Sequence, residues 1–562
     1  MTTAQTPVPT PDPYGAFPRL TDDQMAVLRT CGQRRPVGAG ELLFREGELS
    51  EEFFVVLRGS VAVVEGYGGP ENTMQLYGPR GLIGELGLLE GQPAFLTAVV
   101  REPGEVLAVS WADLRDLLVR EPPLGDLILR AYLQRRVMLA GHGSGFRIIG
   151  SRFSPDTRRL LEFASRNRLP HRWVDLEQDT EAEALLRRLA VTPEQTPVVL
   201  WREDRVLRNP STAELARVIG LRTDPAVAAV CELLVVGAGP AGLAAAVYGA
   251  SEGLSTIVLE AVAAGGQAGT SSRIENYLGF PAGISGADLA ERAVLQAGRF
   301  GARITVPAEA VGLEQEGGHH LVRLADGAAI SARTVVLATG ARYRRLPAPG
   351  SERLEGLGVH YAATLWEART CRLDPVAVVG GGNSAGQAAL FLAAQSPAVH
   401  LLVRGGDLDA SMSRYLTDRI ARHPGIEVLL NTEVQEVTGT DRVEAVLVRD
   451  NRTGEQRVLA DRAVFVFIGA RPCTAWLTGA VGLDSHGSVP TGQDAVGTAP
   501  AELWRHLART PLALETDRPG VFAVGDVRTG SVKRVASAVG EGAMAVRLVH
   551  EHLRVVGSPI IR

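Results

Sequence analysis

The sequence predicts a multidomain α/β protein, and three observations lead to that prediction. Two glycine-rich segments, GAGPAG at 237–242 and GGGNSA at 380–385, each follow a short apolar run of β-formers. Each also opens a stretch rich in Ala, Leu and Gln, which gives the strand–turn–helix context of a dinucleotide-binding domain. Residues 42–65 alternate apolar and polar side chains with glycines at the turns, as in a β-barrel or jelly roll. We therefore expect two Rossmann-like, three-layer domains and an N-terminal β-rich module.

The two glycine-rich segments have the spacing of dinucleotide-binding fingerprints. The first comprises Gly237, Ala238, Gly239, Pro240, Ala241 and Gly242, and the second includes Gly380, Gly382, Asn383, Ser384 and Ala385. The first glycine permits a tight turn, the second lets the backbone approach a pyrophosphate, and the third small residue lets helix pack on strand. The helix N-terminus then offers N–H groups to the phosphates. Two nucleotides held by one chain indicate hydride transfer between them.

The residue that ends the following strand distinguishes the two sites. After the first fingerprint, that strand reads TIVLE and ends at Glu260, whose carboxylate would bind both ribose hydroxyls and repel a 2′-phosphate. After the second, it reads VHLLVR and ends at Arg404, whose guanidinium suits a 2′-phosphate. The first site is therefore predicted to bind FAD or NAD, and the second NADPH in preference to NADH. The alternative for Arg404 is an exposed arginine on an arginine-rich surface.

Further motifs surround the two fingerprints. They are GGQ at 265–267, IENYLGFPAGISGADL at 274–289, ATG at 338–340 and PGVFAVGDV at 519–527. With these motifs, residues 230–562 resemble a bacterial low-molecular-weight thioredoxin reductase. In that family the FAD domain is interrupted by the NADPH domain. The resemblance implies FAD-binding segments at 230–346 and 476–562, with an NAD(P)H-binding domain at 350–473 inserted between them.

The resemblance also implies which residues hold the flavin. Asp526 would bond the ribityl chain, and Gln267 and Asn276 would approach the flavin. The other implied FAD positions are Gly266, Thr339, Gly340, Gly525, Lys533, Arg534 and Val535. Lys533 is the one lysine of the sequence, and its ammonium would stabilise anionic reduced flavin; a lysine with no special role is the alternative. In this family the NADPH domain rotates, which alternates the partner that faces the flavin.

One departure from the family concerns the cysteine pair that passes electrons from the flavin to the substrate. The family carries Tyr-Cys-Ala-Thr-Cys before the second fingerprint, whereas this chain reads YAATL at 361–365, with Ala362 and Leu365 in place of the cysteines. A dithiol is what passes electrons from flavin to a protein disulfide. Cys371 follows nearby as a single cysteine and is predicted to be a buried small hydrophobe. No side chain is expected to act as a catalytic acid or base, because positioning carries the hydride step.

Composition limits the class of protein. The 562 residues suggest roughly four domains, and a net charge of −5 argues against a nucleic-acid partner. No apolar run of about 18 residues predicts a membrane span. The cysteines, Cys31, Cys231, Cys371 and Cys473, lack paired spacing, so we expect neither a disulfide scaffold nor a metal site. Residues 1–17 have no signal-peptide pattern and are expected to be a disordered lead-in to a cytoplasmic protein.

Residues 18–140 form the N-terminal β-rich module. The segment GLIGELGLLEGQPAFLTAVV at 81–100 resembles the phosphate-binding cassette of a cyclic-nucleotide-binding domain. The possible ligand positions that this resemblance implies are Gly84, Glu85, Leu86 and Thr97. The phosphate-pairing arginine of that family is replaced by Ala94, which removes the charge partner of a cyclic phosphate. A different small-molecule ligand, or a purely structural dimer module, is therefore favoured over cyclic-nucleotide binding.

The segment DLILRAYLQRRVML at 126–139 has apolar residues at helical spacing. In the cyclic-nucleotide-binding family a helix so placed often pairs subunits, which leads us to expect a homodimer. The alternative is that this helix packs on its own barrel.

Residues 146–222 show a βαβ pattern, a hairpin-like stretch and a last helix, and they resemble a small glutaredoxin- or thioredoxin-type domain. The resemblance would make Thr196–Pro197 its cis-proline turn. Its active-site cysteines should open the first helix, where this chain has Ser154, Pro155, Asp156 and Thr157. Those residues form a good N-cap and first turn but do no thiol chemistry.

The sequence therefore predicts an FAD- and NADPH-dependent oxidoreductase that passes hydride from NADPH to FAD. The electron acceptor is left open between a quinone, O₂ and an external redox protein. One alternative is a regulatory sensor that reports NADP(H) balance through the N-terminal modules. Another keeps thioredoxin-disulfide reductase activity by using the cysteines of a partner protein.

Overall fold

The chain forms two compact units in a computed structural model, Met1–Thr223 and Asp224–Arg562. The structure describes residues 15–69, 71–84, 93–142, 145–201, 205–221, 230–271, 273–363, 373–497, 499–505, 507 and 509–557. Among these residues, no helix is both long and apolar enough to cross a bilayer.

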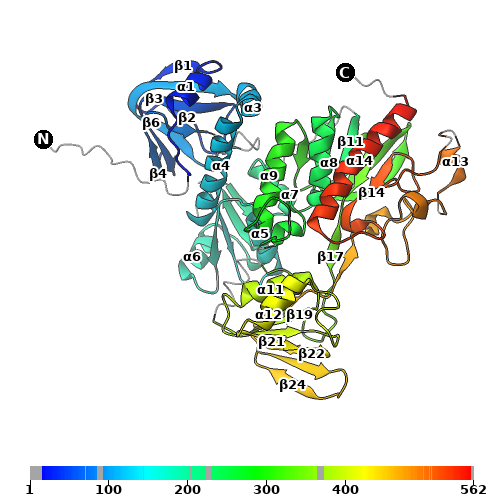
Figure 1. The fold of residues 1–562 in the computed structure, drawn as a ribbon. Coiled ribbons are helices and arrows are strands. Elements are labelled where there is room, and N and C mark those ends of the chain that lie inside the picture. The colour runs from blue at the N-terminus through cyan, green and yellow to red at the C-terminus, as the bar shows by residue number, and fades with distance from the viewer. Residues whose placement is uncertain are drawn as a thin grey trace. The chain divides into compact units, whose positions relative to one another are not determined.

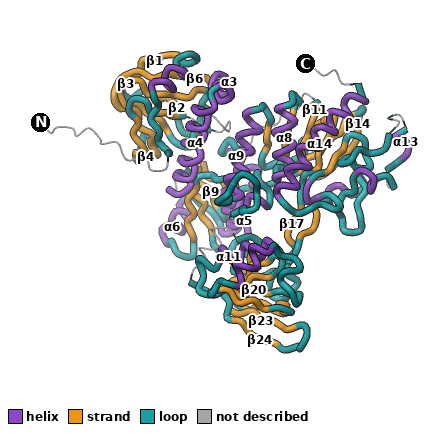
Figure 2. Tube along the Cα trace, viewed as in Figure 1, coloured by secondary structure: helices purple, strands orange, loops and turns teal. Residues whose placement is uncertain are grey.

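An antiparallel barrel-like sheet opens the first unit (Figures 1 and 2). Its strands are β1 (Gln33–Val37), β2 (Leu42–Phe44), β3 (Glu52–Glu65), β4 (Asn72–Tyr77), β5 (Leu82–Ile83) and β6 (Thr97–Ser110). The order is β1-β6-β3-β4, with β2 on β6 and β5 on β3. The long strands β3 and β6 cross closely at two glycines, where a methyl group on Gly104 would lie 2.0 Å from the Arg58 carbonyl oxygen. Their apolar residues form the core of this module, but they are buried in continuous runs, such as 53–56 and 61–64 of β3, and not in the alternating pattern that the sequence predicted.

In the described part of this module, three helices flank the sheet. They are α1 (Asp22–Leu28), α3 (Trp111–Arg120) and α4 (Pro122–His142). Ile128 and Ala131 of α4 are fully buried in the cluster that also holds Leu107 of β6. Of the two roles that the sequence left open for this helix, the structure therefore shows packing against its own barrel.

A four-stranded sheet follows in the same unit. Its elements are β7 (Phe146–Gly150), α5 (Pro155–Arg166), β8 (His171–Asp175), α6 (Thr180–Arg188), β9 (Val198–Trp201), β10 (Arg205–Arg208) and α7 (Thr212–Val218). The order is β10-β9-β7-β8, with β7 parallel to β8 and antiparallel to β9. Ser154 caps α5, its Oγ accepting from the Thr157 N–H at 3.3 Å. The Thr196–Pro197 peptide bond is cis, as predicted.

The second unit contains a seven-stranded sheet that the chain enters twice. Its first elements are β11 (Cys231–Val236), α8 (Pro240–Ser251), β12 (Thr256–Leu259), α9 (Gly286–Arg299), β13 (Arg303–Thr305), β14 (Ala310–Glu316), β15 (His319–Leu324) and β16 (Ala329–Leu337). Its last elements are α13 (Ala501–Trp504), β27 (Val521–Ala523) and α14 (Val535–Val555). The order is β13-β12-β11-β16-β15-β14, and β27 adds in parallel to β16. We call this part the FAD half.

A five-stranded parallel sheet is inserted between those two passages, and we call this part the NADPH half; both halves are named after the cofactor that the sequence predicts for each. Its elements are β18 (Val359–His360), β19 (Val376–Val379), α11 (Asn383–Leu392), β20 (Val399–Leu402), α12 (Arg414–Ala421), β21 (Ile426–Leu429) and β25 (Ala463–Val466). The order is β18-β25-β19-β20-β21. A separate antiparallel sheet is made by β22 (Thr432–Thr438), β23 (Ala445–Asp450) and β24 (Gln456–Leu459). The chain leaves the FAD half through β17 (Ala341–Tyr343) and returns through its partner β26 (Ala470–Pro472), so the predicted insertion of one domain in the other is present.

Candidate functional site

The three glycines of the first fingerprint meet three different steric demands. Gly237 has a φ of +107°, and a methyl group there would lie 2.3 Å from the Ala338 carbonyl oxygen. A methyl group on Gly242 would lie 1.8 Å from the Gly237 carbonyl oxygen, because α8 packs tightly on the turn. On Gly239, by contrast, it would meet its nearest neighbour, Gly266 Cα, at 3.9 Å. The middle position alone is thus open, as backbone approach by a pyrophosphate requires.

The first turn of α8 lies directly after the open position at Gly239. The helix begins at Pro240 after the N-cap Gly239, which has no side chain to cap it. The early N–H groups of a helix have no partner within the helix and favour anions. The N-terminus of α8 therefore fits a dinucleotide phosphate.

Glu260 is held at the edge of the same turn. Its Oε2 accepts from the Ala238 N–H at 2.8 Å and its Oε1 from the Val262 N–H at 3.0 Å. The side chain is only partly buried, so the carboxylate keeps an accessible face. This position directly after β12 is where a ribose-binding acid is expected.

The GGQ loop packs directly against the fingerprint. The Gly265 N–H donates to the Ala238 carbonyl oxygen at 2.7 Å. A methyl group on Gly266 would lie 3.0 Å from Gly239 Cα, so the two backbones nearly touch. The Gln267 side-chain amide donates to the Ala341 carbonyl oxygen in β17. Gln267 therefore joins the nucleotide site to the strand that leads into the NADPH half.

Asp526 lies near the first fingerprint in the fold, although the two are far apart in the sequence. It lies in the single-turn 3₁₀ helix Gly525–Val527, where a methyl group on Gly525 would meet Ala241 Cβ at 3.1 Å. Burial raises the pKa of Asp526, and the Lys533 ammonium acts in the opposite direction. The turn is fixed by Glu541, which accepts from the Gly525 N–H at 2.7 Å. Asp526 is thus placed beside the start of α8, as a ribityl contact would require.

The start of α14 also faces this region. The helix begins at Val535 after Arg534, whose side chain makes no capping bond, and Lys533 is exposed just before it. A methyl group on Gly542 of α14 would lie 2.1 Å from the Ala241 carbonyl oxygen, so α14 and α8 cross in close contact (Figure 1). The structure therefore brings the Asp526 turn and α14 of the second segment against the first fingerprint.

Thr339 and Gly340 lie where the chain crosses between the halves. Thr339 Oγ1 donates to the Cys473 carbonyl oxygen at 2.9 Å, and the Cys473 N–H donates to the Gly340 carbonyl oxygen at 2.9 Å. Both residues thereby join the outgoing and returning strands. Asn276, in contrast, lies beside a cleft between the halves together with Tyr415 and Arg419.

The second fingerprint repeats the geometry of the first. Gly380 has a φ of +142°, and a methyl group there would lie 2.4 Å from the Phe467 carbonyl oxygen. On Gly382, the N-cap of α11, its nearest neighbour would be 4.0 Å away, so this position is open. Ala385 is fully buried against the turn. These residues fit a second dinucleotide.

Two polar residues at the start of α11 have partners within the chain. Asn383 Oδ1 accepts from the Ser413 N–H at 2.6 Å, which ties α11 to α12. Ser384 lies beside the Tyr343 phenol. Burial raises the pKa of Tyr343, a hydrogen bond with Ser384 lowers it, and the nearby Asp526 charge raises it. Tyr343 of β17 is therefore close to the second fingerprint, and the charge of Asp526 also acts on its phenol.

Arg404 lies two residues beyond the end of β20, whereas Val403 holds the position that Glu260 has in the first site, directly after the strand. The Arg404 side chain is 83% exposed, and its Nε lies 3.9 Å from Glu433 Oε1. An exposed guanidinium at this edge is accessible to a 2′-phosphate. Its exposure is equally that of a surface arginine, so a mutation has to decide between the two roles.

Comparisons with known proteins agree with this geometry. The family model described as pyridine nucleotide-disulphide oxidoreductase matches residues 231–542. The chain belongs to that family. It is 34% identical over 322 residues to a thioredoxin reductase of Treponema pallidum, which covers 57% of this chain and 97% of the relative. It is also 34% identical over 314 residues to a thioredoxin reductase of Mycolicibacterium smegmatis, covering 56% of this chain and 94% of the relative.

Solved structures give the same family. The crystal structure of Lactococcus lactis thioredoxin reductase in its FR conformation is 28% identical with a TM-score of 0.51, covering 58% of this chain and 99% of that one. Thioredoxin reductase of T. acidophilum is 27% identical, also with a TM-score of 0.51. FAD and NADPH are the cofactors of this group of flavin oxidoreductases, so the predicted enzyme class and cofactors are confirmed. A second family model, the cyclic nucleotide-binding domain, matches residues 34–121.

Residues 361–363 are the described part of the segment 361–365, which precedes the second fingerprint. Tyr361 accepts from the Leu346 N–H at 3.1 Å through its phenol oxygen, and Ala363 is buried. Ala362 is half-buried beside them, whereas Leu365 and Cys371 lie outside the described residues. The described part of this segment, residues 361–363, contains no cysteine.

Burial disfavours the thiolate form of the described cysteines. Burial raises the pKa of Cys231 to about 12. It also raises the pKa of Cys31 and of Cys473, the latter only partly offset by Arg342. Because the thiolate is the reactive form, these thiols are less reactive at neutral pH than an ordinary cysteine. Within the described residues, no cluster of three or more His, Cys, Asp or Glu side chains could hold a metal ion.

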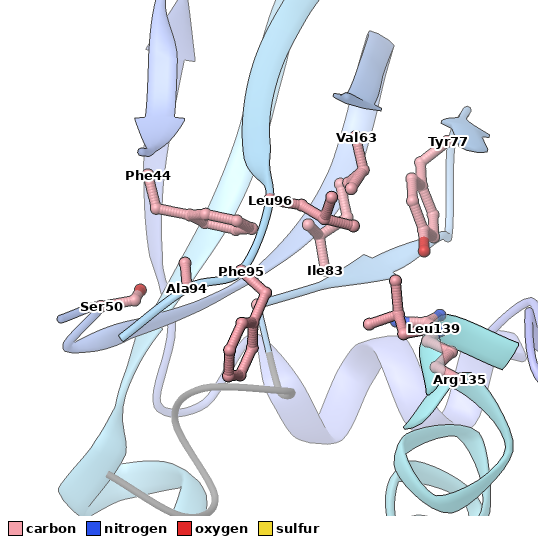
Figure 3. Close-up of a pocket in the computed structure, with 11 residues that line it drawn as sticks. Phe44, Ser50, Val63, Tyr77, Ile83, Ala94, Phe95, Leu96, Arg135 and Leu139 are labelled. Carbon is pink, nitrogen blue, oxygen red and sulfur yellow. The ribbon is translucent and has the colours of Figure 1, made fainter. Parts of the chain in front are cut away.

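The N-terminal module holds a cavity of about 50 Å³ between its strands and α4 (Figure 3). Gly84 and Ala94 line it together with apolar side chains, while Glu85 and Leu86 lie outside the described residues. Thr97 is buried, and its Oγ1 accepts from the Glu46 N–H at 3.1 Å. Its hydroxyl therefore braces a loop of the barrel.

Arg135 also lines the cavity, and the sequence did not single it out. Its side chain is 4% exposed, its Nε donates to the Ala16 carbonyl oxygen at 2.7 Å, and its Nη1 donates to the Leu82 carbonyl oxygen at 3.1 Å. The guanidinium also lies over the Tyr77 ring at 5.1 Å. The available signal was an arginine pair at 135–136 within an apolar helical pattern.

Proposed function

We propose that this protein transfers hydride from NADPH to FAD and delivers the electrons to an acceptor outside its own chain, with no internal dithiol. The replacement of both family cysteines by Ala362 and Leu365 is the observation on which this proposal rests. FAD, when bound, accepts a hydride and passes two electrons on. The overall reaction consumes one NADPH, one proton and one oxidised acceptor, and gives NADP⁺ and the acceptor reduced by two electrons.

The residues of the chain have distinct tasks in this proposal. Gly239 and Gly382 admit the two pyrophosphates, and Glu260 and Arg404 select a different ribose at each site. Asp526 would orient the ribityl chain. The half-buried Ala362 leaves room beside the flavin for a planar or small acceptor, such as a quinone or O₂, or for a redox protein.

The segment 146–222 is proposed to be a thioredoxin-type module without thiols. The strand order β10-β9-β7-β8 and the capped helix α5 support this assignment. The cap residues Ser154 and Thr157 stand where such a module carries its cysteines, so it would not relay electrons.

An acceptor screen on the purified protein tests the proposed function. NADPH should bleach the flavin, and a quinone, O₂ or a redox protein without exchangeable disulfides should then sustain turnover. Turnover with a dithiol protein alone would instead assign the outlet to cysteines of a partner. Bleaching with negligible turnover on every acceptor, together with a redox-dependent change in assembly, would indicate a sensor. A protein that does not take up FAD would refute all of these.

A further inference from the structure

An ion pair that the proposed chemistry does not use joins the two halves of the flavoprotein unit. Arg419 of α12 donates from Nη1 to Glu275 Oε2 at 2.8 Å. Glu275 belongs to the FAD half and precedes Asn276, whereas Arg419 belongs to the NADPH half. Both residues line a cleft of about 410 Å³ between the loop at 273–283 and α12.

Glu275 lies in the loop at 273–284, whose two ends are hydrogen-bonded to each other. Ile274 and Ile284 exchange two backbone hydrogen bonds at the base of the loop, at 2.7 and 3.1 Å. Arg273 Nε also donates to the Ala282 carbonyl oxygen at 2.8 Å. The carboxylate of Glu275 is therefore carried on a braced part of the FAD half.

The Arg419 side is connected to the second fingerprint. The Ser413 N–H, directly before α12, donates to Asn383 Oδ1 at 2.6 Å. Ser411 Oγ donates to the Gly381 carbonyl oxygen at 2.8 Å. Met412 packs so closely that a methyl group on Gly386 would lie 2.6 Å from its sulfur. Helices α11 and α12 are therefore joined (Figure 1), and any rotation of the NADPH site carries Arg419 with it.

We propose that Glu275 and Arg419 are positioning residues that favour the domain orientation seen here, in which hydride is delivered to the flavin. The pair spans the FAD half and the NADPH half, so breaking it removes a direct link between the two nucleotide-binding parts of the chain. The proposal rests on the proposed function of the two sites. Arg419 is 51% and Glu275 24% exposed, and an ion pair of such exposure shifts a two-state equilibrium about two- to fivefold.

Rapid-mixing kinetics of flavin reduction by NADPH test this role. Arg419→Gln and Glu275→Gln should each slow the observed reduction measurably, by at most about fivefold, at low ionic strength. The charge-swapped double variant Glu275→Arg/Arg419→Glu should recover most of the loss. In roughly 1 M salt all forms should converge, because the Debye length falls to about 3 Å. Unchanged FAD content would show that the FAD site is intact.

A matched control comes from an ion pair within the FAD half. Arg323 binds Glu314 through two bonds, at 2.7 and 2.9 Å, and the two side chains are 52% and 51% exposed. Arg323→Gln should leave the reduction rate and its salt dependence unchanged. If Arg419→Gln and Glu275→Gln behave like this control, or accelerate reduction, the positioning role is refuted.

A distance measured between the FAD half and the NADPH half tests the role of the ion pair independently of the proposed function. Spin labels at the exposed Val311 of the FAD half and Val458 of the NADPH half report the orientation without any turnover. Arg419→Gln should shift or broaden the distance distribution, and Arg323→Gln should not. If wild-type flavin is not reduced by NADPH, the proposed function fails while the distances still decide the positioning role of the ion pair. Identical distributions in all three proteins would overturn that role.

Discussion

At the scale of single residues, each fingerprint is defined by how close its glycines come to other backbone atoms. Gly237 and Gly242 leave no room for a methyl group, whereas Gly239 faces open space. The same contrast distinguishes Gly380 from Gly382 in the second site. The glycines that admit a nucleotide are therefore separable from those that shape the turn.

Gly242→Ala should abolish FAD binding. The added methyl group would lie 1.8 Å from the Gly237 carbonyl oxygen, so α8 must shift away from the turn. The ratio of flavin to protein absorbance in the purified variant measures this. Gly298→Ala in α9 is the control, since its methyl group meets nothing within 4 Å. That variant should keep FAD and gain up to about 1 kcal/mol of helix stability. Full FAD content in Gly242→Ala would contradict the packing account.

Arg404→Ala should weaken NADPH binding and leave NADH binding nearly unchanged. A charge-assisted bond to a phosphate is worth about 1.5–3 kcal/mol, so the KM for NADPH should rise about tenfold or more. Arg457→Ala is a suitable control, because Arg457 pairs with Glu427 at 3.1 Å elsewhere in the NADPH half. Equal effects of Arg404→Ala on both nucleotides would make Arg404 a surface arginine.

At the scale of elements, a buried network fixes β27 and α14, which carry the second FAD segment. Glu515 is fully buried and accepts from Arg509 Nη1 at 2.6 Å and from the Gly520 N–H at 2.8 Å. Burial alone would raise the pKa of Glu515, but the hydrogen bonds from His552, Arg509 and the backbone lower it to about 2. The charged carboxylate is therefore part of the folded state.

The stability of this network should depend on pH in the acid range. Because the folded pKa of Glu515 is depressed, its contribution is complete above the unfolded pKa of about 4.3 and is lost as pH falls toward about 2. The contribution is on the order of 3 kcal/mol. Chemical unfolding between pH 6 and pH 3 measures it. Glu515→Gln should be less stable at pH 6 and should flatten the decline. A wild-type slope retained in the variant would contradict this account.

The elements also show what the sequence could and could not predict. The fingerprints, the strands before them and the acid or arginine after them were predictable, because their chemistry lies within one strand–turn–helix unit. The Arg419–Glu275 contact joins residues 144 positions apart, so only tertiary packing reveals it. Arg135 likewise reaches its cavity because α4 packs across the barrel. For Asn383, local sequence indicated a nucleotide contact, but the structure also bonds its side chain to Ser413.

At the scale of the whole molecule, we propose that both halves contribute residues to electron entry and that electrons leave without a dithiol of this chain. Introducing a dithiol is a direct test. The double variant Ala362→Cys/Leu365→Cys recreates the C-x-x-C spacing before the second fingerprint. It should gain NADPH-dependent reduction of a disulfide substrate, since a dithiol beside flavin can exchange with it. The single variant Ala362→Cys is the control and should not turn over. Equal activity in wild type and double variant would show that another thiol pair already serves.

The central claim, that FAD is the sole internal electron store, is tested most directly by anaerobic reductive titration of the purified protein. Dithionite should deliver about two electrons per FAD before the titration ends, because flavin alone takes up one hydride equivalent. The Ala362→Cys/Leu365→Cys variant should take up about four, since a disulfide is a further two-electron couple. Uptake of about four electrons by the wild-type protein would contradict the claim.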